Sequence, residues 1–133
     1  MPTVVRGSDN IDTSNVATQT ELDAKSPQMA TAWVNFDGTT VDGSNHCTIR
    51  DSYNVDYVLR TATGNYDVYF SVAMDNLNYS AVASLGRNGI ASYDRNDSVA
   101  DLALDKVTVQ AWFQTGSQVD VDNISLTIFG GKA

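Results

Sequence analysis

Residues 55–72, VDYVLRTATGNYDVYFSV, contain two runs of alternating apolar and polar side chains on either side of a short turn. Such alternation is typical of β-strands that have one face in a core and the other in solvent. The apolar face of the second run extends from Tyr66 to Val72. Gly64 supplies the positive φ that a tight turn requires. The stretch therefore predicts a β-hairpin.

Alternation of the same kind recurs on both sides of this hairpin. In the first strand Ala32, Val34 and Phe36 share one face, and in the second Ile49 and Tyr53 do. The further predicted strands cover residues 32–38, 49–55, 79–85, 107–114 and 124–129. About seven short strands separated by Gly, Asn and Asp turns predict an all-β antiparallel sandwich over residues 29–133. The longest connection, residues 86–106, is expected to contain a helical turn at 99–104.

Composition excludes several classes of function. The chain has 133 residues, enough for one domain with its own core, and a net charge of −8 with no cluster of Lys or Arg. This charge argues against nucleic-acid binding. No apolar run is long enough to insert in a membrane, and the N-terminus lacks a secretory signal pattern, so we expect synthesis in a cytoplasm. Cys47 is the single cysteine, which rules out an intrachain disulfide.

Residues 1–28 differ from the rest of the chain because they are polar and contain no aromatic side chain. They are predicted to form an N-terminal attachment arm that is either extended or helical over residues 15–25, with a cap at residues 12–14. Too few apolar side chains are present for such a helix to be stable alone. The candidate attachment residues are Val4, Val5, Val16 and Leu22.

Four large aromatic side chains fall on the polar side of their strands. They are Trp33, Tyr69, Trp112 and Phe129. Each would lose roughly 2–3 kcal/mol by remaining in water, and a monomer seldom exposes such a patch. We expect identical copies of the chain to cover them in a closed homo-oligomer. The alternative is that a β-bulge shifts the register and turns some of them inward.

No set of residues predicts catalysis. His46 and Cys47 are adjacent, but neither an orienting group nor an oxyanion hole is apparent, and neighbours in a strand point to opposite faces. Both are expected to be ordinary loop residues. The acidic runs at 94–97 and 120–123 lack the pattern of a calcium loop, so a loop-bound Ca²⁺ stays a minor alternative to turn-capping acids. No other cofactor is predicted.

Several segments in one order resemble the repeated C-terminal β-module of bacteriophage tail fibres and virion spikes. They are AWVNFDG (32–38), IRDSYNV (49–55), TGNYDVYF (63–70), AMDNLNYSAV (73–82) and NISLTIFG (123–130). The resemblance covers roughly residues 29–129 and implies a β-sandwich assembled as a homotrimer. No fibre shaft precedes the module in this sequence, which implies a short standalone copy attached to other virion proteins by residues 1–28.

The resulting expectation is a non-enzymatic virion structural protein, a short trimeric fibre or spike on a tail or head appendage. Its distal loops, 39–46 and 86–97, would face a host surface glycan, with Arg87, Tyr93 and Arg95 as candidate contacts. Packing of these loops against a neighbouring subunit is the equally open alternative. A capsid-decoration protein is the second functional hypothesis, and a glycan-cleaving spike is the third and least favoured.

Overall fold

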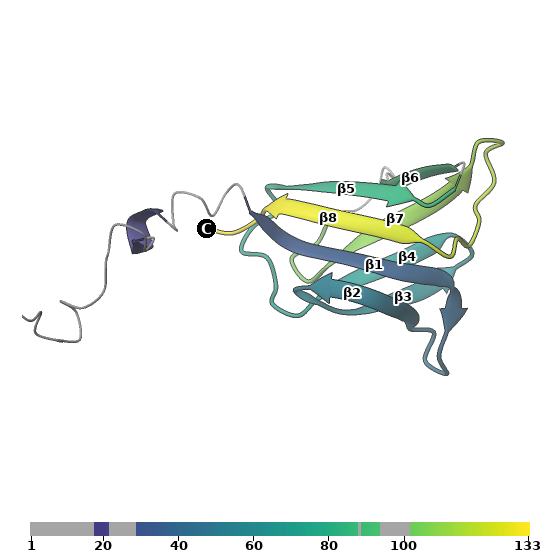
Figure 1. Cartoon of the computed structure of the whole chain (residues 1–133), viewed down its shortest axis with the longest axis horizontal. Helices are drawn as coiled ribbons and strands as arrows, with labels where there is room; N and C mark the ends of the chain where they lie inside the picture. Colours follow the sequence, from purple (N-terminus) through teal and green to yellow (C-terminus); the bar gives the residue numbers. More distant parts are fainter. Residues whose placement is uncertain (1–17, 22–28, 88, 94–101) are drawn as a thin grey trace, which may run out of the picture.

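The computed structural model of the chain describes residues 18–21, 29–87, 89–93 and 102–133 (Figure 1). Eight β-strands make up almost all of the regular structure in these ranges. Their bounds are β1 Ala30–Val41, β2 Cys47–Tyr53, β3 Val55–Ala62, β4 Asn65–Phe70, β5 Tyr79–Leu85, β6 Gly89–Tyr93, β7 Lys106–Phe113 and β8 Ile124–Gly130. The predicted all-β fold is confirmed.

The strands form two antiparallel four-stranded sheets that pack face to face (Figure 1). Sheet A has the strand order β2-β1-β8-β5, and sheet B has the order β3-β4-β7-β6. β2 leads directly into β3 and β5 leads into β6, so the chain passes from one sheet to the other at both edges. The edge strands of the two sheets are therefore connected in pairs, β2 to β3 and β5 to β6.

The core lies between the sheets and follows the predicted alternation. Ala32, Val34 and Phe36 of β1 are buried, as are the alternate residues of β7 and β8. Val68 and Tyr66 of β4 face them from sheet B, and the Tyr66 ring packs edge-on against Phe36 at 5.2 Å between centroids. Each large apolar side chain buried in this way contributes about 1.5–3 kcal/mol.

Asn54 forms the corner between β2 and β3. Its φ of 53° is left-handed, a conformation that Asn tolerates better than most residues. The side-chain amide donates to the carbonyl oxygens of Thr31 and Val72 at 3.2 and 3.1 Å, and its oxygen accepts from Val72 N at 2.8 Å. One side chain therefore holds together the start of β1, the β2–β3 corner and the start of the β4–β5 connection.

The structure corrects four details of the predicted elements. β6 lies inside the segment 86–106, where no strand was expected. The described part of the predicted helical turn, residues 102–104, instead turns back on β7 through a bridge between Leu102 and Val107. The third detail is the ends of two strands: β1 extends to Val41, and β4 ends at Phe70, which leaves Val72 64% exposed outside the strand.

The fourth correction concerns the face of Tyr53. A bulge at Arg50 separates the pairs Phe36–Ile49 and Asn35–Asp51. Beyond this bulge the side chains change face, so that Ile49 packs against the core whereas Tyr53 lies outside with Trp33. The predicted common face of Ile49 and Tyr53 is therefore wrong.

Candidate functional site

The outer face of sheet A carries an apolar row that crosses all four strands. Trp33 of β1 pairs with Tyr53 of β2 on one side and with Thr127 of β8 on the other. Thr127 in turn pairs with Val82 of β5. Tyr53 is 58% and Val82 60% exposed, while Trp33 is half-buried. Paired residues share a face, so these four side chains form one continuous row.

Phe129 extends this row toward the end of the sandwich at which β1 begins. It lies two residues beyond Thr127 on the same face of β8, pairs with Ser80 of β5, and is 40% exposed. We name the surface formed by Trp33, Tyr53, Val82, Thr127 and Phe129 the sheet A band.

Polar side chains border the sheet A band toward the opposite end. The Asn35 amide nitrogen donates to Ser125 Oγ at 2.8 Å and to Asn123 Oδ1 at 2.6 Å. Arg50 reaches Asp37 at 3.5 Å and donates to the Asp122 carbonyl oxygen at 2.5 Å. The polar groups next to the band are thus satisfied by their own hydrogen bonds, and Val41 at the far end of β1 is the other large apolar side chain exposed on a described strand of sheet A.

On one part of the outer face of sheet B, aromatic side chains stack on one another within the chain itself. His46 stacks on Tyr57 with centroids 4.4 Å apart, and Tyr57 stacks on Tyr69 at 4.5 Å. Lys106 Nζ lies 5.4 Å from the Tyr69 ring and donates to Asp67 at 2.7 Å. We name His46, Tyr57, Tyr69 and Lys106 the sheet B ladder. It accounts for Tyr69 without a partner chain.

Trp112 also lies on the outer face of sheet B, opposite Ile90 of β6. The Trp112 indole nitrogen donates to Gln110 Oε1 at 3.1 Å, and Gln118 bridges to the Trp112 backbone. The four predicted interface aromatics therefore separate into two pairs, Trp33 with Phe129 on sheet A and Tyr69 with Trp112 on sheet B. The two outer faces of a sandwich point in opposite directions, so one contact cannot cover both pairs.

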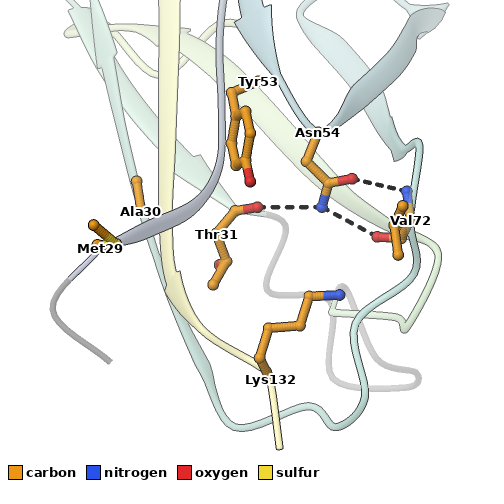
Figure 2. Close-up of a pocket in the computed structure, with 7 residues that line it drawn as sticks. All are labelled: Met29, Ala30, Thr31, Tyr53, Asn54, Val72 and Lys132. Atoms are coloured by element: carbon orange, nitrogen blue, oxygen red, sulfur yellow. Dashed lines mark hydrogen bonds between the residues drawn. The ribbon is translucent and has the colours of Figure 1, made fainter. Parts of the chain in front are cut away.

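A pocket of about 590 Å³ adjoins the sheet A band where residues 1–28 join the sandwich (Figure 2). Met29, Tyr53 and Val72 give it apolar walls, and Thr31 and the Asn54 amide contribute polar groups. This pocket was not predicted from the sequence. It is lined by the start of β1, the β2–β3 corner and the segment after β4. The hydrogen bonds of Asn54 at this corner hold the three segments together.

Of the three predicted receptor-facing residues, the structure describes Arg87 and Tyr93. Arg87 is exposed in the β5–β6 connection, with its guanidinium carbon 6.0 Å from the centre of the Phe113 ring. The backbone of Tyr93 pairs with Val109 inside β6, so its place in a loop was wrongly predicted. Arg95 lies outside the described residues. The β1–β2 and β5–β6 connections lie at the end of sheet A remote from Met29, because β1 and β5 both run antiparallel to β8.

His46 and Cys47 point to different surroundings. His46 stands in the sheet B ladder, whereas Cys47 begins β2 and is buried in the core. Burial raises the pKa of the Cys47 thiol to about 11, which keeps it protonated at neutral pH. The expectation that both are ordinary loop residues is corrected, because Cys47 belongs to the core.

A polar network closes the remote end of the sandwich. The Asp120 carboxylate accepts from Arg60 Nη2 at 2.6 Å, from Gly64 N at 2.9 Å and from the Tyr66 hydroxyl at 2.8 Å. Burial favours a higher pKa for Asp120, but these donors outweigh it and hold the pKa below its usual value. Asp120 is thus occupied by protein donors. Among the described residues no group of three His, Cys, Asp or Glu side chains is arranged to hold a metal ion.

The described part of the N-terminal arm is one helical turn that begins at Thr18. Thr18 N donates to the Glu21 carboxylate at 2.7 Å and Glu21 N donates to Thr18 Oγ1 at 3.2 Å, a capping box. The candidate attachment residues Val4, Val5, Val16 and Leu22, and the predicted cap at residues 12–14, lie outside the described residues.

Comparison with protein-family models, with curated proteins and with solved structures finds no match. Within the ranges that the structure describes, helices are too short to span a membrane.

Proposed function

We propose that this chain is a non-enzymatic structural module that assembles with copies of itself through the sheet A band. The observation that carries this proposal is the band itself. Tyr53 and Val82 are more than half exposed beside Trp33 and Phe129, on a face whose neighbouring half is hydrogen-bonded and polar. Covering several large apolar side chains is the main driving force of subunit association.

The arrangement of the two faces favours a closed ring. If the sheet A band of one copy met sheet B of the next, contacts on opposite faces would stack copies into an open filament unless the rotation between them closed a ring. The sheet B ladder already covers its own rings, so this part of sheet B has less to gain from a partner, although Ile90 beside Trp112 is 58% exposed. Copies that turn the sheet A band toward a common axis form a closed assembly, and the resemblance to fibre modules favours three copies.

Within this class we propose a short trimeric fibre or spike of a tailed-phage virion. Support comes from the resemblance of five segments to the fibre module and from the β-sandwich that such modules form. In this proposal residues 1–28 attach the module to other virion proteins. The remote end, with Arg87, faces outward and binds a host surface glycan.

The start of β1, where residues 1–28 join the sandwich, and the remote loops lie at opposite ends, which also suits a capsid-decoration protein. Such a protein needs attachment at one end but no receptor at the other. Binding of the purified chain to host envelopes would favour the fibre, whereas restored stability of stripped capsids on its addition would favour decoration.

Self-assembly is tested by measuring the mass of the full chain in solution together with the emission of Trp33. We expect three times the chain mass of 14.3 kDa. In a Trp112→Phe variant, which leaves Trp33 as the single indole, the emission should shift to the blue on assembly. A folded chain of 14.3 kDa at micromolar concentration, with Trp33 emitting as in water, would refute the proposal.

A further inference from the structure

The pocket beside the sheet A band has the form of a receptor for a short apolar segment with an acidic neighbour. Met29, Tyr53 and Val72 line it with exposed apolar surface. Lys132 stands at its lower rim and donates to the Ala73 carbonyl oxygen at 2.6 Å (Figure 2). An ammonium group has three donors, so Lys132 can bind a carboxylate as well. The volume of about 590 Å³ is within the range of pockets that hold a ligand of drug size.

The chain itself contains a segment of this chemistry. Residues 1–17 contain two short stretches with apolar side chains, TVV at 3–5 and NIDTSNV at 10–16. Their larger apolar side chains are Val4, Val5, Ile11 and Val16, and Asp9 and Asp12 are the acids. A segment with so few apolar side chains cannot build a core of its own, so a surface that is already folded is where it can bury them.

The position of the pocket indicates from which copy the segment comes. Met29, the residue through which the arm enters the sandwich, is part of the pocket wall, and Tyr53 belongs both to the pocket and to the sheet A band. Copies that meet at the band therefore bring the pocket of one close to the start of another's arm. Residues 22–29 span up to roughly 28 Å when extended, which allows the arm to reach across such a contact.

We propose that the pocket receives residues 1–17 of a neighbouring copy, so that the assembled chains are joined by exchanged arms. This inference rests on the self-association proposed above, and it assigns residues 1–17 to a neighbouring copy, so that attachment to other virion proteins would fall to residues 18–28. Exchange of a segment between identical subunits adds contacts to an assembly without a new surface on the sandwich. In a docked arm the apolar side chains lie against Tyr53 and Val72, and an acid of the arm lies near Lys132.

Cross-linking of the full chain tests which copy supplies the segment. A photoactivated residue replaces Val72 in chains of natural isotope content, and these are assembled with chains labelled with ¹⁵N. Cross-links from position 72 to residues 1–17 of the other isotope are expected. Cross-links confined to one chain, or none to residues 1–17, would overturn the proposal. The same group at Ser117, exposed in the β7–β8 loop at the remote end, should give no cross-link to the arm.

Protease cleavage at Arg6 gives an independent readout. Val72→Asp places a charge in the apolar wall and should raise the rate of cleavage at Arg6 about tenfold or more by releasing the arm. Val41→Asp is the matched control, because Val41 is also an exposed valine but lies at the far end of β1. An equal cleavage rate in both variants would contradict docking of the arm in the pocket.

The solution mass separates the two ways in which the inference fails. A monomeric full chain would refute both the self-association and the arm exchange. An intact assembly in which position 72 shows no cross-link to another copy's arm would refute the exchange alone.

Discussion

Trp33 of β1 and Tyr53 of β2 are paired on the outer face of sheet A. The exposed Val82 lies in the same row, two strands further along on β5. The bulge at Arg50 creates this pairing, because without it Tyr53 would turn toward the core side with Ile49. A local irregularity in β2 thus concentrates apolar surface where we propose that copies meet.

A charge in the middle of the sheet A band should prevent assembly while leaving the fold intact. Val82 is 60% exposed in the edge strand β5, so Val82→Asp removes little from the core. In an assembly the new carboxylate would be buried without a partner, and we expect at least about tenfold weaker association. Analytical ultracentrifugation measures the change.

Ser84→Asp provides the matched control for this variant. Ser84 lies two residues along the same exposed face of β5, but it pairs with Ser125 in the polar half of sheet A. This variant should assemble as the unaltered chain does. Equal weakening by both substitutions would show that added negative charge, and not the sheet A band, determines the result.

The stacked pair Tyr57–Tyr69 should show a measurable coupling energy. The centroid separation of 4.5 Å and interplanar angle of 19° describe a stack, for which about 0.5–1.5 kcal/mol of coupling is usual. Chemical denaturation of Tyr57→Ala, Tyr69→Ala and the double variant measures it. The pair Tyr57 and Phe129, on opposite outer faces, should be additive within about 0.5 kcal/mol. Additivity of Tyr57 and Tyr69 as well would contradict the stack.

Asp120 should contribute stability that is lost in acid. Its pKa is held below the usual value in the folded chain, so protonation is easier in the unfolded chain. The contribution is therefore present above about pH 4 and disappears as the pH falls through the folded-state pKa. We expect Asp120→Asn to lower the free energy of unfolding by about 1–3 kcal/mol near neutral pH, with a smaller difference in acid.

Urea denaturation at a series of pH values tests this prediction. Asp122→Asn serves as the control, because the Asp122 side chain is exposed two residues away. A difference between Asp120→Asn and the unaltered chain that stays constant through the acid range would be the contrary result.

The sequence was sufficient to predict the β-sandwich and its core, because the alternation in β1, β7 and β8 depends only on which side chains leave water. β6 escaped prediction because its five residues, GIASY, contain little apolar alternation, and its Ile90 faces outward beside Trp112. This strand exists because β7 offers it a pairing edge, which is a tertiary effect.

The candidate site was predicted only in part. The prediction that Trp33 and Phe129 lie on an outer face is confirmed, but Tyr53 and Val82 were not recognised beside them. The position of Tyr53 depends on the register between β2 and β1, and that of Val82 depends on β5 lying next to β8. Neither pairing leaves a signal in the local sequence, since both are fixed by residues far apart in the chain.

Cys47 should react with alkylating reagents only after the chain unfolds. Its side chain is buried at the start of β2, and burial raises the thiol pKa to about 11. The reactive thiolate is therefore scarce up to about pH 9, and access to it requires opening of the core.

Iodoacetamide labelling followed by mass spectrometry should be about a thousandfold slower in the folded chain than in denaturant. A Ser44→Cys variant in a Cys47→Ser background, with its thiol in the exposed β1–β2 turn, should react rapidly in both conditions. Rapid labelling of folded Cys47 would instead mean that the start of β2 opens readily, and would contradict its place in a closed core.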